Sequence, residues 1–133
     1  MNTSLSYTIV IKEAPWQGQQ SLQALKFCQA LLEKGHHLAR VFFYQDGVLN
    51  ASALQWRPAD ENSIESQWRE FALKHQLELA LCITGSLRRG ITDAKEAQRN
   101  ALPSSNVQLP WALTGLGQLI EASVESDRTV SFG

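Results

Sequence analysis

The stretch Leu77-Glu78-Leu79-Ala80-Leu81-Cys82-Ile83 decides the fold of this chain, because it is a short apolar run that closes on a cysteine. Its length, and the polar segment Thr84–Gly90 that follows it, are typical of a buried strand in a parallel sheet. In open α/β sheets, ligands and reacting groups gather where strands end at their carboxyl side. The sequence therefore predicts that the Cys82 thiol lies at the mouth of a parallel sheet.

Strand-like and helix-like segments alternate along the rest of the chain. Runs rich in β-branched and aromatic residues predict three further strands, Leu5–Ile11, Leu38–Tyr44 and Arg128–Phe132. Apolar residues at helical spacing, together with residues of the capping type, predict helices from 19 or 20 to 34, from a cap at 62 or 63 to 76, from 94 to 101 and from 113 to 126. We therefore expect one α/β domain, residues 1–133, with an open, mostly parallel sheet and helices on both faces, as in flavodoxin-like layering.

Three segments have weaker patterns. The segment Gln45–Asp60 is long for a loop in a compact domain, which favours a lid over the thiol or a role at an interface. The segment Thr84–Gly90 is expected to form a polar turn leading to the start of a helix. A short strand is expected near Val107–Trp111, and Pro110 would confine it to the edge of the sheet.

The charge of the chain is nearly balanced. Its 133 residues include 12 basic and 13 acidic side chains, a formal net charge of −1. Proteins that bind RNA or DNA through phosphates usually carry a basic excess or stripe, whereas the only adjacent basic pair here is Arg88-Arg89. We therefore expect no direct contact with nucleic acid.

The sequence shows neither a transmembrane segment nor the features of a signal peptide. No apolar run approaches the length of a transmembrane helix, and the stretch Met1–Ser4 lacks the positive charge that begins a signal peptide. We therefore expect no membrane insertion and a cytoplasmic location.

The usual metal and cofactor motifs are missing from the sequence. The two cysteines form no CxxC pair, and His36 and His37 are adjacent, so their side chains diverge. Gly115-Leu116-Gly117 matches part of a dinucleotide fingerprint, but Ile120 stands where the third glycine belongs. We expect neither a metal nor a cofactor.

Cys82 is the candidate catalytic residue. A reactive cysteine gains thiolate character from backbone N–H groups, a helix amino terminus or nearby cations, and the segment after Cys82 offers all three, with Arg88 or Arg89 as the cation. The alternative is a small apolar filler at the end of a strand, because free cysteine is often buried. A Cys–His pair with one of the three histidines also stays open.

The second cysteine and the tryptophans lead to different expectations. Cys28 shares a helical stripe with Leu25 and Leu32, which predicts a packing role in the core. Trp16 and Trp56 fall in predicted loops, where aromatic side chains either cover the edge of the core or anchor a protein interface. The sequence leaves both roles open.

With these segments in view, the chain resembles the DsrE-type sulfur-relay family, most closely its TusD branch. The stretches that carry the resemblance run in order along nearly the whole chain. They are Gly35-His36, Val41–Val48, Cys82 with Leu87–Gly90, Ser104–Asn106, Leu113–Ala122 and Asp127-Arg128.

The resemblance implies a sulfurtransferase in which the sulfur-carrying cysteine of the family maps onto Cys82. It implies a cytoplasmic hetero-oligomer of TusB-like, TusC-like and TusD-like subunits, each present twice. Sulfur would arrive as a persulfide from a TusA-like donor, leave to a TusE-like acceptor, and serve the 2-thiolation of wobble uridine in tRNA. Beyond the resemblance, we infer that Arg88 or Arg89 stabilises the anionic persulfide.

Three other functions remain open from the sequence. A DsrE-like carrier in dissimilatory sulfur oxidation would use the same chemistry in a different pathway. A scaffold subunit would hold partners without carrying sulfur. A flavodoxin-like nucleotide binder would purify with a coloured or absorbing cofactor.

Overall fold

The computed structural model describes residues 3–133, in which five parallel strands form one sheet; Met1 and Asn2 lie outside the described residues. The sheet order is β4-β3-β2-β1-β5, and every neighbouring pair is parallel. The strands are β1 (Ser6–Ile11), β2 (His37–Phe43), β3 (Leu79–Cys82), β4 (Trp111–Thr114) and β5 (Arg128–Phe132). The parallel α/β sheet expected from the sequence is confirmed.

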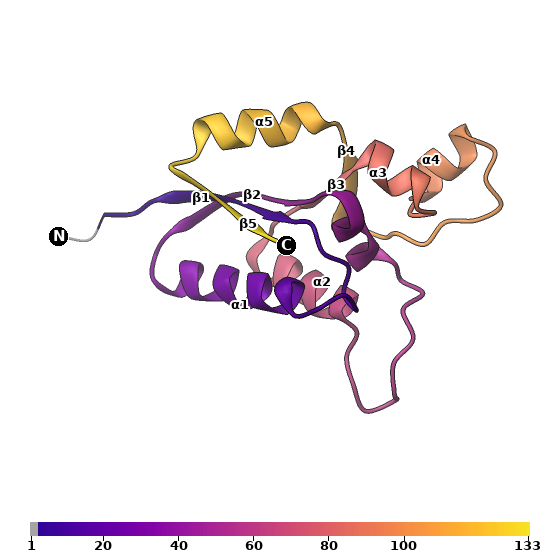
Figure 1. Cartoon of the computed structure of the whole chain (residues 1–133), viewed down its shortest axis with the longest axis horizontal. Coiled ribbons are helices and arrows are strands. Elements are labelled where there is room, and N and C mark those ends of the chain that lie inside the picture. Colours follow the sequence, from indigo (N-terminus) through magenta and orange to yellow (C-terminus); the bar gives the residue numbers. More distant parts are fainter. Residues whose placement is uncertain (1–2) are drawn as a thin grey trace.

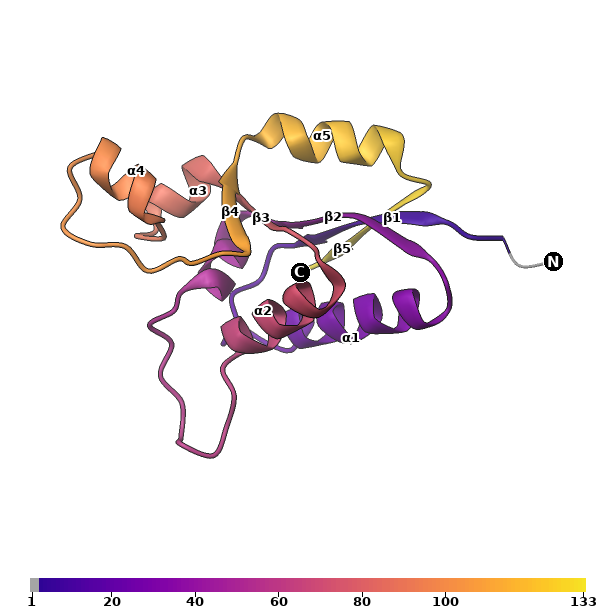
Figure 2. The same cartoon turned by 180° about the vertical axis from the view of Figure 1, so that it is seen from behind.

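Helices lie on both faces of the sheet, as expected (Figure 1). One face carries α1 (Gln20–Glu33) and α2 (Ile64–His75), and the other carries α5 (Leu116–Glu125). Two short helices, α3 (Ile83–Arg88) and α4 (Ala94–Arg99), extend beyond the β3–β4 end of the sheet (Figure 2). No helix within residues 3–133 is long and apolar enough to span a bilayer.

The alternation of side chains along the strands decides which face each residue occupies. Phe43 packs edge-on against Trp68 of α2, with ring centroids 5.1 Å apart, and Phe43 pairs with Leu81. Leu81 therefore faces α1 and α2, and the next residue, Cys82, faces the α5 side. Cys82 pairs in register with Thr114 of β4, so the two side chains are neighbours on that face.

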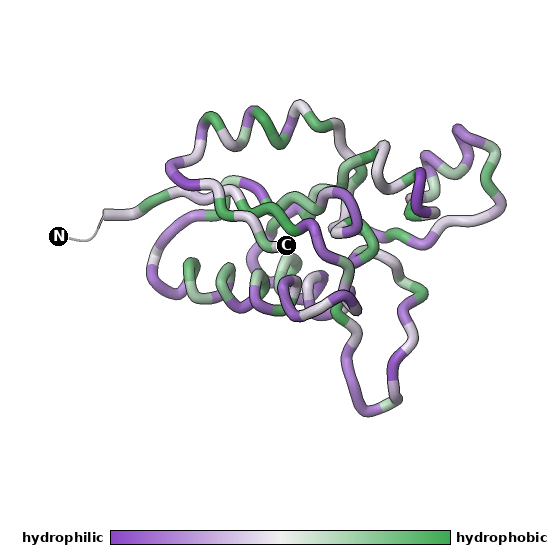
Figure 3. The backbone as a smooth tube through the Cα atoms, viewed as in Figure 1, coloured by the Kyte–Doolittle hydropathy of each residue, from purple (hydrophilic) through white to green (hydrophobic). Residues whose placement is uncertain are grey.

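The apolar core follows the strands. Figure 3 shows the strands as mostly hydrophobic, whereas the tip of the long loop after Ala51 is hydrophilic. Trp68 and Trp111 are fully buried. Burying an aromatic side chain of this size is among the largest single contributions to a core. These two rings, with Phe43 between them, pack α2 against β2 and β4, the strands on either side of β3.

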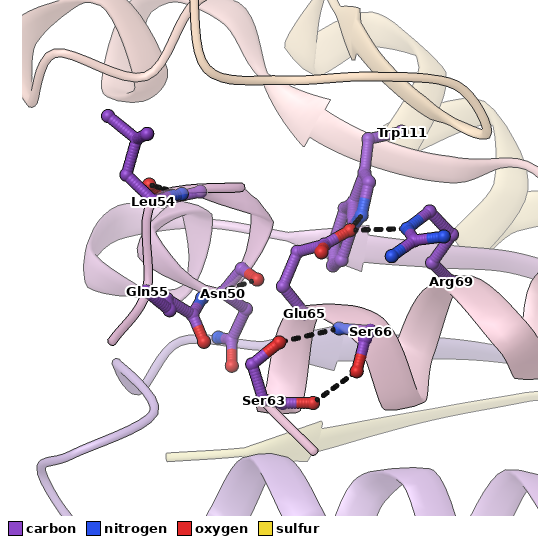
Figure 4. Close-up of polar contacts among 9 residues, drawn as sticks. Asn50, Leu54, Gln55, Ser63, Glu65, Ser66, Arg69 and Trp111 are labelled. Carbon is purple, nitrogen blue, oxygen red and sulfur yellow. Dashed lines mark hydrogen bonds and ion pairs between the residues drawn. The ribbon is translucent and has the colours of Figure 1, made fainter. Parts of the chain in front are cut away.

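Buried polar contacts fix the elements around the mouth of the sheet. Trp111 Nε1 and Arg69 Nε both donate to Glu65 Oε2, at 2.9 and 3.0 Å (Figure 4). On the other side of α2, Trp68 Nε1 donates to Ser21 Oγ at 2.9 Å, and that hydroxyl donates to Asn50 Oδ1 at 2.7 Å. These bonds satisfy polar atoms that would otherwise be costly to bury, and they hold β4 and the segment after β2 in place.

Two helix caps predicted from the sequence are confirmed. Ser63 Oγ accepts from Ser66 N at 3.1 Å at the start of α2, and Asp93 Oδ1 accepts from Glu96 N at 2.8 Å at the start of α4. A side-chain oxygen at this position satisfies one of the free N–H groups of the first helical turn.

Several predicted boundaries were wrong. The last helix begins at Leu116 and not at Leu113, because residues 111–114 pair with β3 as β4. This edge strand begins directly after Pro110, so the strand expected at 107–111 lies further along the chain. The strand expected to reach Ile83 ends at Cys82.

The expected polar turn at Thr84–Gly90 was also wrong, because residues 83–88 form α3. Cys82 has extended backbone and acts as the N-cap of this helix. Gly85 lowers helix propensity without preventing a helix, and the chain leaves the helix at Gly90, whose φ of +72° favours glycine.

The segment Gln45–Asp60 consists of two parts. Residues Gln45–Ala51 form the 3-10 helix η1. Gly47 allows η1 to pack closely, because a Cβ there would collide with the carbonyl oxygen of Ile11. The remainder extends away from the sheet on the side of α2 (Figures 1 and 2).

Candidate functional site

Cys82 lies at the carboxyl end of β3, as the sequence predicted. It is both the last residue of the strand and the N-cap of α3, and it is 7% exposed. Its side chain makes no cap hydrogen bond to α3, and both cysteines of the chain are free thiols. The sulfur therefore sits at the turn from strand to helix, beside the free N–H groups of a first helical turn.

The side chain of Cys82 lies over Gly85, three residues along α3. The Cys82 Sγ is 3.7 Å from the place that a Cβ of residue 85 would take, and Arg89 Nη1 is 3.5 Å from the same place. The sulfur and the guanidinium therefore lie on the border of one small space. We call this space, at the Cβ position of residue 85, the Gly85 notch.

Arg89 is held in position by two contacts. Its Nε donates to Asp46 Oδ1 of η1 at 2.9 Å, and its Nη1 donates to the Gly85 carbonyl oxygen at 3.1 Å. The hydrogen bond from Arg89, followed by one from Gln17, lowers the pKa of Asp46 below its ordinary value. Asp46 is thus the charge partner that orients Arg89.

The two arginines considered from the sequence have different surroundings. Arg89 borders the Gly85 notch together with the Cys82 sulfur. The Arg88 side chain is exposed, and it makes no hydrogen bond or ion pair with another residue in the range 3–133. The structure therefore brings Arg89, and not Arg88, to the edge of the site.

Two hydroxyl groups near Cys82 lack hydrogen-bond partners. Ser86 is 0% exposed, and its Oγ has no partner within the described residues. The Oγ1 of Thr114 is also buried without a partner there, although Thr114 pairs in register with Cys82. Each of these hydroxyl groups can still donate one hydrogen bond.

The histidines lie far from Cys82 along the fold. His37 begins β2, His36 precedes it, and His75 ends α2, so all three lie near the amino ends of the parallel strands. His36 Nδ1 accepts from Leu5 N at 3.1 Å, and the His75 ring packs on Phe71. The Cys–His pair left open by the sequence is not formed.

Cys28 is a core residue, as predicted. It lies on α1, is 0% exposed and belongs to the main apolar cluster. Burial raises the pKa of the Cys28 thiol to about 12, because the thiolate loses its hydration in an apolar environment.

Exposed apolar side chains lie beside the site. Trp16 is 68% exposed, Trp56 86% and Leu54 77%; we call these three residues the tryptophan surface. All three border a hollow of about 370 Å³ that reaches Arg89 and Gly90. Of the two roles considered for these loop tryptophans, their exposure favours the protein interface.

The sequence did not single out Gly85, Ser86, Asp46 or Thr114. Gly85 and Ser86 could have been identified from the sequence once Cys82 was taken as a helix cap, because positions three and four after a cap lie close to it. The last two come from other elements, and only the folded sheet and η1 place them.

Comparison with known proteins identifies the family of this chain. The model of the DsrE/DsrF-like family matches residues 5–132. The chain belongs to that family.

No group of three or more His, Cys, Asp or Glu residues within 3–133 is placed to hold a metal ion.

Relatives in the family are similar over nearly their whole length. The chain is 44% identical over 128 residues to the sulfurtransferase TusD of Serratia proteamaculans, covering 96% of this chain and 99% of that protein. TusD of Salmonella newport is also 44% identical, with 96% and 100% covered. DsrE of Allochromatium vinosum, named as a sulfurtransferase, is 42% identical, with 97% and 99% covered.

A solved structure has the same fold. The crystal structure of the ychN protein of E. coli superposes with a TM-score of 0.75, covering 96% of this chain and 99% of that one. At 19% identity, this similarity bears on the fold alone. It agrees with the parallel sheet and helical layers described above.

Proposed function

We propose that this chain is a sulfurtransferase subunit that carries sulfur as a persulfide on Cys82. The observation that carries the proposal is the position of Cys82, at the strand-to-helix turn beside the Gly85 notch and Arg89. The names of the relatives supply the chemistry, since TusD and DsrE are both named sulfurtransferases. The buried Cys28 is left as a packing residue.

The transfer needs no oxidant or reductant. The Cys82 thiol loses its proton to solvent, and the thiolate attacks the outer sulfur of a donor cysteine persulfide. The new S–S bond forms as the old one breaks, and the donor cysteine leaves as a thiolate with the electron pair of the broken bond. In the second transfer, an acceptor thiolate attacks the outer sulfur on Cys82, and Cys82 leaves as the thiolate.

The surroundings of Cys82 suit an anionic sulfur. A thiolate is stabilised by a nearby cation and by the free N–H groups at the start of a helix. Arg89 supplies the cation at the Gly85 notch, and Asp46 keeps it there. We assign the stabilisation of the persulfide to Arg89 and not to Arg88, because Arg89 borders the Gly85 notch.

The partners are proposed from the relatives and from the tryptophan surface. We propose TusB-like and TusC-like subunits in a heterohexamer, a TusA-like donor and a TusE-like acceptor. Either exchanging protein must bring a cysteine to Cys82, and the tryptophan surface lies beside Arg89. Exposed aromatic residues near such a site are suitable anchors. We place this relay in the cytoplasm, without direct contact with nucleic acid or membrane.

The pathway is proposed to be the 2-thiolation of wobble uridine in tRNA, as the TusD-named relatives suggest. The 42% identity to DsrE of Allochromatium vinosum favours sulfur oxidation as the second candidate. Deleting the gene in its own host separates the two pathways. Loss of 2-thiouridine from tRNA supports the first, and intact tRNA thiolation with impaired growth on reduced sulfur supports the second.

A transfer assay tests the carrier role against a purely scaffolding one. A donor protein with a radiolabelled cysteine persulfide is mixed with the chain and then with an acceptor protein. We expect label to reach the acceptor through the wild type and through Cys28→Ala, but not through Cys82→Ser. Equal transfer through Cys82→Ser would show that the chain only holds its partners.

A further inference from the structure

Position 85, close to Cys82, holds a glycine that the fold does not require. It lies in the first turn of α3 with helical backbone, and its φ is not in the left-handed region that favours glycine. A Cβ at this position would meet no atom closer than 3.5 Å, which is ordinary van der Waals contact. Alanine is the better helix former. The fold therefore accepts a methyl group where the sequence has none.

The space left by Gly85 is bordered by the reacting group. The three atoms nearest to it are Arg89 Nη1 at 3.5 Å, Cys82 Sγ at 3.7 Å and Cys82 Cβ at 3.8 Å. Cys82 is otherwise enclosed, since it is 7% exposed and belongs to the core cluster. Protein atoms thus surround most of the Cys82 side chain, and the Gly85 notch borders both its sulfur and the Arg89 guanidinium.

A second observation concerns two buried hydroxyl groups, one on the residue after Gly85 and one on the residue paired with Cys82. Ser86 follows Gly85 and is 0% exposed, yet its Oγ has no partner in the described part of the chain. Thr114 Oγ1, from the strand position paired with Cys82, is buried and unpartnered in the same way. A buried hydroxyl without a partner is costly. An acceptor carried by Cys82 for part of the cycle would give such hydroxyl groups a partner.

We propose that the Gly85 notch seats the outer sulfur of the Cys82 persulfide, and that Gly85 is a positioning residue for this state. This inference rests on the proposed function. An S–S bond is about 2.05 Å long. Directed from Sγ toward the notch, 3.7 Å away, and bent to a normal C–S–S angle, it brings the outer sulfur to about 2 Å from a methyl carbon at residue 85. Alanine would therefore fit the unloaded protein and clash with the loaded one.

A pair of glycine variants tests the proposal. The full chain is treated with inorganic polysulfide, freed of excess reagent, and examined by intact-mass measurement over time. Gly85→Ala is compared with Gly117→Ala, because Gly117 lies in the first turn of α5 and a Cβ there meets nothing within 4 Å. We expect both variants to keep or raise the Tm. Gly117→Ala should hold sulfur like the wild type, and Gly85→Ala should lose occupancy or lifetime on the order of tenfold.

A measurement on the wild type supports the test without any variant. In a nitrogen-15 NMR spectrum, loading with polysulfide should shift the side-chain resonances of Arg89 and leave those of Arg88 in place. Unshifted Arg89 resonances in a loaded sample would contradict the notch even if Gly85→Ala failed to fold.

The possible failures are distinguishable. A wild-type chain that takes up no sulfur on Cys82 would overturn the proposed function, and the notch with it. A wild-type chain and a Gly85→Ala chain that hold sulfur equally well would overturn the notch alone and leave the carrier role standing.

Discussion

The two cysteines of this chain have the same side chain in opposite surroundings. Cys28 lies in the middle of α1, fully enclosed by the core, and burial raises its pKa to about 12. Cys82 lies where β3 becomes α3, with Arg89 across the Gly85 notch. The fold thus keeps one thiol neutral and gives the other a cation and free amide groups. The difference comes from position in the sheet and not from the residue type.

The largest expected difference between the two thiols is in alkylation. With a pKa of about 12, Cys28 is about one ten-thousandth thiolate at pH 8, and it is also inaccessible. We expect iodoacetamide to label Cys82 in the folded protein at least a hundredfold faster than Cys28, as measured by peptide mass mapping. Equal labelling of both in urea provides the control, and native labelling of Cys28 at the rate of Cys82 would contradict the comparison.

A second prediction concerns alkaline stability. The folded pKa of Cys28 lies above its ordinary value of 9.0, so the folded chain keeps a proton that the unfolded chain loses above pH 9. The contribution of the Cys28 proton to the free energy of unfolding is fully present below pH 9. It is lost as the pH rises toward about 12, by about 1.4 kcal/mol per pH unit. Urea unfolding of the reduced protein at several pH values should show a shallower decline for Cys28→Ala than for the wild type. Parallel declines would show that Cys28 ionises normally in the fold.

The two adjacent arginines allow the surroundings of Cys82 to be tested with a matched pair of variants. Arg89→Gln removes the cation that borders the notch, and we expect sulfur uptake from a persulfide donor to slow by about five- to tenfold. This range discounts a charge-assisted hydrogen bond for the partial exposure of the guanidinium. Arg88→Gln is the matched control, with an expected change below about twofold. Equal effects of the two variants would indicate a general charge effect in place of a positioned one.

The smallest effect is expected at Asp46. Asp46→Asn weakens the contact that orients Arg89 at 2.9 Å, while the bond from Arg89 to the Gly85 carbonyl oxygen remains. We expect uptake to slow by about two- to threefold. In the Arg89→Gln background the Asp46→Asn change should have no further effect, because the two residues act through one contact. Additive losses would assign Asp46 a role of its own.

The sequence predicted the parts of this molecule that depend on local pattern. The apolar run to Cys82 predicted β3 and the mouth of the sheet, and Ser63 and Asp93 predicted helix starts, because strands and caps are determined by neighbouring residues. The helical stripe shared by Cys28 and Leu25 predicted the buried thiol. The segment after Cys82 was wrongly expected to be a turn, since its glycines and polar residues are also typical of turns.

The missed parts depend on contacts between distant segments. Asp46 reaches Arg89 only because η1 packs against α3, and Thr114 lies beside Cys82 only because β4 pairs with β3 in one register. Neither relation leaves a periodic signal in the chain. The notch itself depends on an absent side chain, whose meaning appears only when the atoms around Gly85 are placed.

The most direct measurement of the central claim is the site of sulfane sulfur after exposure to a persulfide donor. The reduced chain is loaded, its mass is measured intact, and the modified peptide is then identified. The account predicts a gain of about 32 Da, one sulfur atom, on Cys82 in the wild type and in Cys28→Ala, and no gain in Cys82→Ser. Sulfur found on Cys28, or the same gain in Cys82→Ser, would contradict it.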